Sequence, residues 1–129
     1  MDLKKIVSIL KKADTKKKIK FIILFGSVSR NEQTPLSDID IAVYYDASAE
    51  ERFKFQIQAG GQLPNKVDFH IFQDLPLALQ NEVITGTTLY CSNFQFMFDK
   101  VMSVIHDYSS FEKYLNEYYH SLEVQILGT

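Results

Sequence analysis

The 129-residue sequence contains a single cysteine, Cys91, so no disulfide can form within the chain. We interpret Cys91 as a small buried residue. No apolar run is long enough to cross a membrane, and the first residues do not resemble a secretory signal peptide. These absences lead us to expect a cytoplasmic protein.

The chain also lacks a strong excess of charge, with 14 Lys and Arg residues against 16 Asp and Glu residues. A formal net charge of -2 gives no reason to expect general binding to nucleic acid. A basic cluster near the N-terminus is interpreted as the solvated face and C-terminal end of a first helix, with a nucleic-acid or partner contact as the alternative. Its members are Lys11, Lys12, Lys16, Lys17, Lys18 and Lys20.

Internal repeats and low-complexity segments are absent from the sequence. A chain of this length fits one domain, and a content of 46% hydrophobic residues is enough to bury a core. We therefore expect one domain over residues 1–129, with a core at about 18–91 and C-terminal helices at about 93–126.

Hydrophobic periodicity predicts strands at residues 19–25, 38–45, 66–72 and 87–91. Helices are expected at 2–14, 48–59 and 75–84, with a short helix at 27–30, a loop at 31–37 and a final helical pair at 93–107 and 110–126. This order predicts an α/β (α+β) fold, in which helices flank a small mixed β-sheet and a C-terminal helical pair follows.

The most informative segment is FIILFGSVSRNEQTPLSDIDIAV, at residues 21–43. Its first apolar run ends at Gly26, and a second run contains two aspartates one residue apart, Asp38 and Asp40. Side chains two residues apart on a strand share a face, so the two carboxylates should lie side by side. Because paired carboxylates repel each other and resist desolvation, they indicate a site for a divalent cation.

The residues around this acid pair predict phosphate contacts. Gly26 and Ser27 follow a strand, where backbone N–H groups are free to meet phosphate, and Gly26 allows close backbone approach. Arg30 is placed to clamp a β- or γ-phosphate, with a surface ion pair as the alternative. Ser37 precedes the acid strand and is placed to fix the turn by a local hydrogen bond.

Nucleotidyl transfer joins a hydroxyl to an α-phosphate and releases pyrophosphate, and two metal ions about 3.5–4 Å apart can serve this reaction. Asp38 and Asp40 are placed to bridge two Mg²⁺ ions. Asp68 is our candidate for a third carboxylate that takes the acceptor proton, because it interrupts an apolar strand. His70 shares its face, but we favour a structural role for it over a functional one.

The spacing of Gly26 and Ser27, ten residues, Asp38-x-Asp40 and a later Asp68 resembles the DNA polymerase β nucleotidyltransferase superfamily. More narrowly, GSVSR and SDIDIAV resemble the minimal nucleotidyltransferases of prokaryotes, many of which are antitoxins encoded with a HEPN-domain toxin. The resemblance covers roughly residues 20–90 and implies Mg²⁺ and ATP, with Gly26 and Ser27 as phosphate contacts and the three aspartates as metal ligands. It also implies adenylylation of a tyrosine on the toxin.

The chain departs from this pattern at Ser29-Arg30-Asn31, where many minimal members have Ala-Arg-Gly. Since asparagine tolerates the left-handed conformation, the turn should survive. The segment from Gly86 to Tyr90 matches the usual end of the family's core, whereas the helices after it are less diagnostic.

We therefore expect Mg²⁺-dependent transfer of AMP from ATP to a hydroxyl, with a tyrosine of a HEPN-type toxin as the acceptor. One alternative is a binding module that neutralises its partner by contact through the C-terminal helices. Another is a transferase for a small molecule such as an aminoglycoside, which usually needs a larger second domain. A template-directed polymerase is disfavoured by the acidic balance and the lack of a duplex-binding domain. Both a homo-oligomer and a hetero-oligomer are compatible with the sequence.

Aromatic residues crowd the C-terminal part of the chain, beyond what a two-helix hairpin would bury against a small sheet. They are Phe94, Phe96, Phe98, Tyr108, Phe111, Tyr114, Tyr118 and Tyr119. We expect some of them in the core and the others in an interface, because an exposed apolar patch would mark a partner surface.

Overall fold

The computed structural model describes residues 3–26 and 38–127. Its elements are α1 (Leu3–Ala13), β1 (Ile19–Phe25), β2 (Ile39–Tyr45), α2 (Ala49–Gly60), β3 (Val67–Ile71), the 3-10 helix η1 (Phe72–Asp74), α3 (Leu77–Val83), β4 (Thr87–Cys91) and α4 (Phe94–Leu127). The predicted strands are confirmed, as are the predicted helices before β4. The short helix expected at 27–30 and the loop expected at 31–37 lie outside the described residues.

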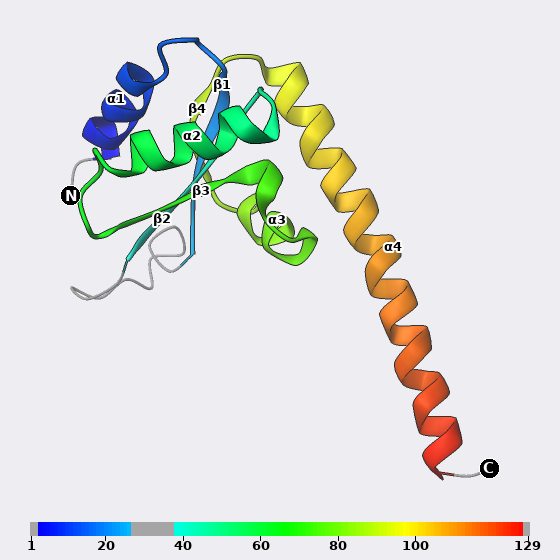
Figure 1. Ribbon diagram of the computed structural model, residues 1–129. Coiled ribbons are helices and arrows are strands. Elements are labelled where there is room, and N and C mark those ends of the chain that lie inside the picture. The colour runs from blue at the N-terminus through cyan, green and yellow to red at the C-terminus, as the bar shows by residue number, and fades with distance from the viewer. Residues whose placement is uncertain (1–2, 27–37, 128–129) are drawn as a thin grey trace.

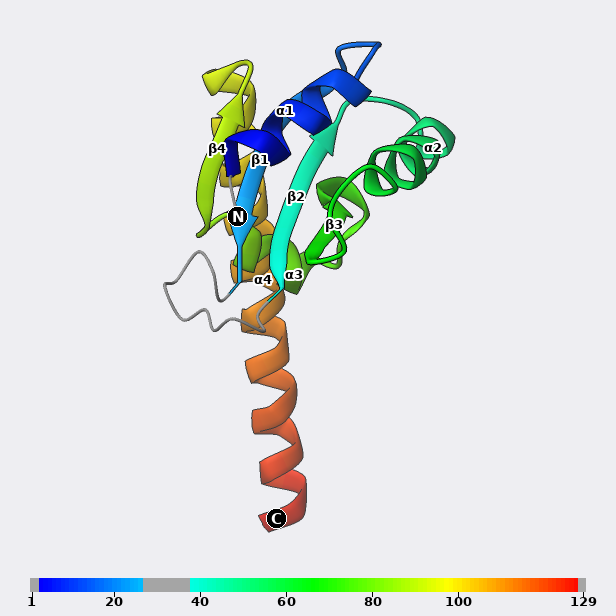
Figure 2. The same cartoon turned by 90° about the vertical axis from the view of Figure 1, so that its left-hand side faces the viewer.

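The four strands form one mixed sheet, as predicted, and their order in it is β3-β2-β1-β4 (Figure 1). β1 is antiparallel to both β2 and β4, whereas β2 and β3 are parallel. Helices α1 and α2 pack on one face of the sheet and α3 and the first part of α4 on the other (Figure 2). The sheet is therefore covered on both sides, with β3 and β4 at its edges.

Apart from Lys20, β1 is apolar, as expected of a strand with both faces buried. Ile22 and Leu24 join the core under α1 and α2, and the alternate residues join the core under α3 and α4. In β2, Ile39, Ile41 and Val43 all face the first core, because alternate residues of a strand share a face. Asp40 consequently lies on the opposite face of β2.

The turn from α1 into β1 depends on Asp14, whose side chain is buried with 8% exposure. Its two carboxylate oxygens accept hydrogen bonds from the backbone N–H groups of Lys18 and Ile19, each at 2.9 Å. Lys17, the residue before Lys18, takes the left-handed conformation with φ of 54°. Asp14 thus satisfies backbone donors that would otherwise be buried without partners.

The predicted C-terminal helical pair was wrong, because Phe94–Leu127 is a single helix of 34 residues. No glycine or proline interrupts this segment, and the serine pair at the expected break stays helical. There, the Ser110 hydroxyl donates to the backbone carbonyl of His106 at 3.2 Å. Within the described residues, no helix is both long and apolar enough to cross a membrane.

We expect Asp14→Ala to lower the free energy of unfolding by about 1–3 kcal/mol, because two buried backbone N–H groups lose their acceptor. Thermal melting followed by circular dichroism should show a decrease of several degrees. The matched control is Asp46→Ala, which removes a half-exposed carboxylate 4.0 Å from Lys20 Nζ and should cost under about 0.5 kcal/mol. Equal losses in the two variants would contradict the role given to Asp14.

Candidate active site

Two aspartates meet across the parallel strands β2 and β3. Asp40 and Asp68 are direct partners in the strand register, so their side chains leave the sheet on the same face. His70, two residues further along β3, shares that face. One ligand atom from each of these three residues lies within 4.8 Å of the others. The register thus brings together two acids that are 28 residues apart in the chain.

His70 is tied directly to this acid pair. Its Nε2 lies 3.2 Å from Asp68 Oδ2, and its ring centroid lies 5.8 Å from that of Phe25. Sequence reasoning favoured a structural role for His70 and so left it out of the site. The signal that could have placed it there is the two-residue spacing from Asp68 on an alternating strand.

Gly26 ends β1 directly beside Asp40. Its φ of 79° belongs to the left-handed region, which favours glycine. A Cβ atom at this position would overlap Asp40 Oδ2. Glycine is therefore required here by the backbone conformation and by the closeness of the carboxylate.

The electrostatics of the site show an excess of negative charge. Burial, followed by the charge of Asp68, raises the pKa of Asp40 above its ordinary value, and Asp38 adds a smaller increase. The charge of His70 lowers the same pKa without cancelling the rise. The ionised form of Asp40 thus lacks sufficient positive compensation from the described residues.

The donor set fits a divalent cation. Carboxylate oxygens are the protein ligands preferred by Mg²⁺, and those of Asp40 and Asp68 converge on one point. A cation there would offset the charge that raises the pKa of Asp40. The imidazole of His70 suits a softer metal than Mg²⁺, but its contact with Asp68 can hold that carboxylate in orientation.

The other predicted site residues lie further from the cluster or beyond the described part of the chain. Asp38 is exposed and lies one residue before β2, outside the group formed by Asp40, Asp68 and His70. The strand therefore starts one residue later than predicted. Ser27, Arg30 and Ser37 fall in residues 27–37, which the structure does not describe.

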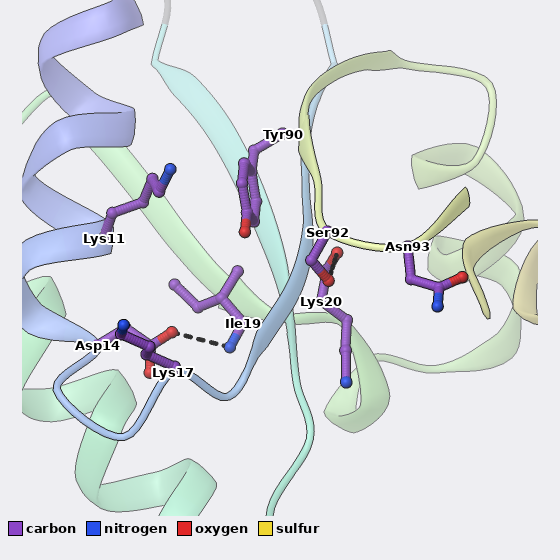
Figure 3. Close-up of a pocket in the computed structure, with 8 residues that line it drawn as sticks. All are labelled: Lys11, Asp14, Lys17, Ile19, Lys20, Tyr90, Ser92 and Asn93. Atoms are coloured by element: carbon purple, nitrogen blue, oxygen red, sulfur yellow. Dashed lines mark hydrogen bonds between the residues drawn. The ribbon is translucent and has the colours of Figure 1, made fainter. Parts of the chain in front are cut away.

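A separate cavity of about 560 Å³ lies at the other end of β1 from Gly26 (Figure 3). Its lining includes Lys11, Lys17 and Lys20, and Lys11 Nζ lies 4.5 Å from the ring centroid of Tyr90. Most of the basic cluster is exposed, which agrees with the predicted solvated helix end. This cavity contains none of the residues of the acid pair.

Comparison with known proteins places this geometry in a family. Residues 4–95 match the family model described as "Polymerase beta, Nucleotidyltransferase". Putative protein adenylyltransferase MJ1547 of Methanocaldococcus jannaschii is 40% identical over 63 residues, which are 49% of this chain and 48% of that protein. The chain thus matches about half the length of that curated relative.

Solved structures share the same fold. A chain of a toxin–antitoxin complex crystallised with AMP-PNP aligns with a TM-score of 0.75 at 23% identity, over 96% of this chain and 100% of that one. A chain from the complex of tri-AMPylated Shewanella oneidensis HEPN toxin with MNT antitoxin aligns with a TM-score of 0.67 at 22% identity, over 94% and 95%. Since the family model covers most of this chain, including the acids on β2 and β3, the chain belongs to the polymerase beta nucleotidyltransferase family.

Proposed function

We propose that this chain is a Mg²⁺-dependent adenylyltransferase that moves AMP from ATP to a tyrosine hydroxyl of a HEPN-type toxin, and so acts as the antitoxin. The observation that carries the proposal is the register of Asp40 and Asp68, with Gly26 beside the Asp40 carboxylate. This arrangement gathers carboxylate oxygens at the exposed end of a strand where backbone can approach a phosphate. Family membership supports the same reaction class.

In this proposal the three aspartates have different tasks. Asp38 and Asp40 hold the metal ions, and Asp68 helps to hold one of them and accepts the proton of the attacking hydroxyl. The ions supply charge neutralisation for the triphosphate and the leaving pyrophosphate. Asp68 suits the proton-accepting role because its side chain is 54% exposed on an edge strand.

The phosphates of ATP would be held at the end of β1. Gly26 has no side chain between its backbone and the Asp40 carboxylate, so a triphosphate can reach both. Ser27, Arg30 and Ser37 keep the roles predicted for them: two phosphate contacts and a turn that positions the acid strand. These three assignments rest on sequence pattern alone.

The proposed acceptor is a protein rather than a small molecule. β3 lies at the edge of the sheet, and within residues 3–26 and 38–127 no second lobe closes over Asp68. An open edge admits a side chain carried by another macromolecule. The solved relatives include chains crystallised with HEPN toxins, one of them AMPylated, and this likeness supports the same kind of partner here.

A second candidate function is neutralisation of the partner by contact, without catalysis. The observation that favours it is the row of exposed apolar residues on α4, which offers a binding surface far from the acids in sequence. The two functions separate experimentally, because only the first one depends on the aspartates.

Transfer can be tested by intact mass spectrometry of the protein encoded beside this chain, after incubation with the chain, ATP and Mg²⁺. We expect a mass gain of one or more AMP units. Asp40→Asn and Asp38→Asn should each reduce the gain by at least about 10²-fold, because metal-held charge stabilisation is lost. Chelation of Mg²⁺ by EDTA should do the same.

Retained transfer in either aspartate variant would refute the metal assignment. A stable complex in which the wild-type chain transfers no AMP would favour neutralisation by contact. Absence of both transfer and complex would point back to a small-molecule acceptor.

Removing the charge of Asp40 should stabilise the metal-free protein. Because its pKa is raised from the ordinary 3.8, the folded state binds more protons than the unfolded chain, and this contribution to stability falls as pH rises through that range. In EDTA, Asp40→Asn should melt roughly 1–4 °C above wild type at pH 7. The difference should shrink towards pH 4.

Millimolar Mg²⁺ should raise the melting temperature of the wild type more than that of Asp40→Asn. A variant that melts below wild type at pH 7 in EDTA would show that the carboxylate is a net stabilising group, contrary to the raised pKa.

His70 should act as a positioning residue for Asp68. We expect His70→Ala to lower the transfer rate about 10- to 100-fold, the usual effect of losing an outer-shell partner. His70→Gln, which can still donate to the carboxylate, should recover part of the rate. The control is His106→Ala on the exposed surface of α4, and equal rates in His70→Ala and this control would exclude the positioning role.

A further inference from the structure

A row of apolar residues runs along α4 at alternating spacings of three and four. Its members are Val101, Val104, Tyr108, Phe111, Leu115, Tyr118 and Leu122. This spacing puts every member on one side of the helix and is the pattern of a helix that packs lengthwise against another helix. We call these residues the α4 stripe.

The body of the protein covers only the start of the α4 stripe. Val104 is buried with 6% exposure in the core that includes α3 and β1. Further along, the exposed fractions of Phe111, Leu115 and Tyr118 are 47%, 36% and 60%. Among the described side chains, none beyond Val104 on α4 is buried. The stripe therefore continues past the surface that it packs on.

The free half of α4, residues 108–127, projects from the body in both views (Figures 1 and 2). At 1.5 Å per residue, this segment is about 30 Å long. Most of the stability of helices in proteins comes from tertiary packing of an apolar face, and exposed aromatic side chains gain free energy once they are covered. A partner that packs on the stripe would supply both effects.

The charges beside the stripe indicate what kind of partner fits. Lys100 and Asp107 border the stripe on one side, and Glu112 and Glu123 border it on the other, at about 100° of helix rotation per residue. Lys100 lies beside the covered start of the stripe, and past Val104 the bordering charges are acidic. Lys113 lies about 200° around the helix from Leu115, away from the stripe. A second copy of this chain would bring acid against acid, whereas a helix with basic flanks would face opposite charges.

The free half of α4 also extends towards the catalytic end of the sheet. In both views α4 starts near the end of β4 and runs past the end where β1 finishes and β2 begins. Gly26 and Asp38 lie at that end. A partner seated on the stripe would therefore be held on the side of the molecule where the acids are.

We infer that the α4 stripe is the docking surface for a helical partner protein whose own apolar row is flanked by lysine and arginine, and that docking there brings the acceptor hydroxyl to the acids. The docking surface follows from the stripe and its flanking charges. The delivery of an acceptor rests on the proposed function.

Two synthetic amphipathic helical peptides can test the docking surface. Both carry the same leucine and isoleucine row, with lysine at all flanking positions in one peptide and glutamate in the other. Isothermal titration calorimetry with the full chain at 0.15 M salt should detect 1:1 binding of the lysine peptide and at least tenfold weaker binding of the glutamate peptide. Leu115→Glu should weaken binding of the lysine peptide at least tenfold.

Val124→Glu provides the matched control, because Val124 is an exposed apolar residue on the opposite side of α4 from Leu115. It adds the same charge and should leave binding of the lysine peptide within about twofold. Equal binding of the two peptides, or equal losses in the two variants, would overturn the proposal. Circular dichroism of both variants checks that the fold is kept.

Sedimentation velocity of the chain alone tests whether a second copy of the chain covers the α4 stripe. A monomer is expected. A dimer that Leu115→Glu dissociates would assign the stripe to a second copy and overturn the partner proposed here.

The docking surface and the proposed AMP transfer can be refuted independently of each other. Asp40→Asn should bind the lysine peptide as wild type does, and Leu115→Glu should keep the stabilisation by Mg²⁺. A wild-type chain that transfers AMP to the neighbouring protein but does not bind the lysine peptide would refute the docking surface alone. Peptide binding by a chain that never transfers AMP would refute the proposed function alone.

Discussion

The burial of β1 on both faces is the constraint on which the other elements depend. Its apolar side chains alternate between two cores, so α1 and α2 must cover one side of the sheet and α3 and α4 the other. A strand enclosed in this way has no room for unpaired charge along its length. Polar chemistry is consequently confined to strand ends and edges, where Gly26, Asp40 and Asp68 lie.

The residues of the candidate active site lower the stability of the metal-free protein and favour the binding of a cation. Burial and the neighbouring Asp68 disfavour the charged form of Asp40, which is a cost to the protein without a cation. Gly26 brings the backbone against the same carboxylate, in a left-handed conformation that disfavours any other residue. Both features make sense once a cation and a phosphate are brought together at this point, as in the proposed transfer reaction.

α4 links the body that carries the acids to the proposed docking surface for a partner. Its first turns complete the core beneath the sheet, and its later turns carry the same apolar row into solvent. One helix can thus fix a partner relative to the acids, because its direction is set by packing inside the body. A flexible hairpin at the same place would leave that geometry unspecified.

The strand and helix order up to β4 and the candidate acids could be predicted from the sequence, since these depend on local periodicity and spacing. The single helix α4 was missed, although no glycine or proline interrupts residues 94–127. The meeting of Asp40 with Asp68, and the place of His70 beside them, could not be predicted in this way, because strand register is a long-range feature that depends on packing on both faces of the sheet.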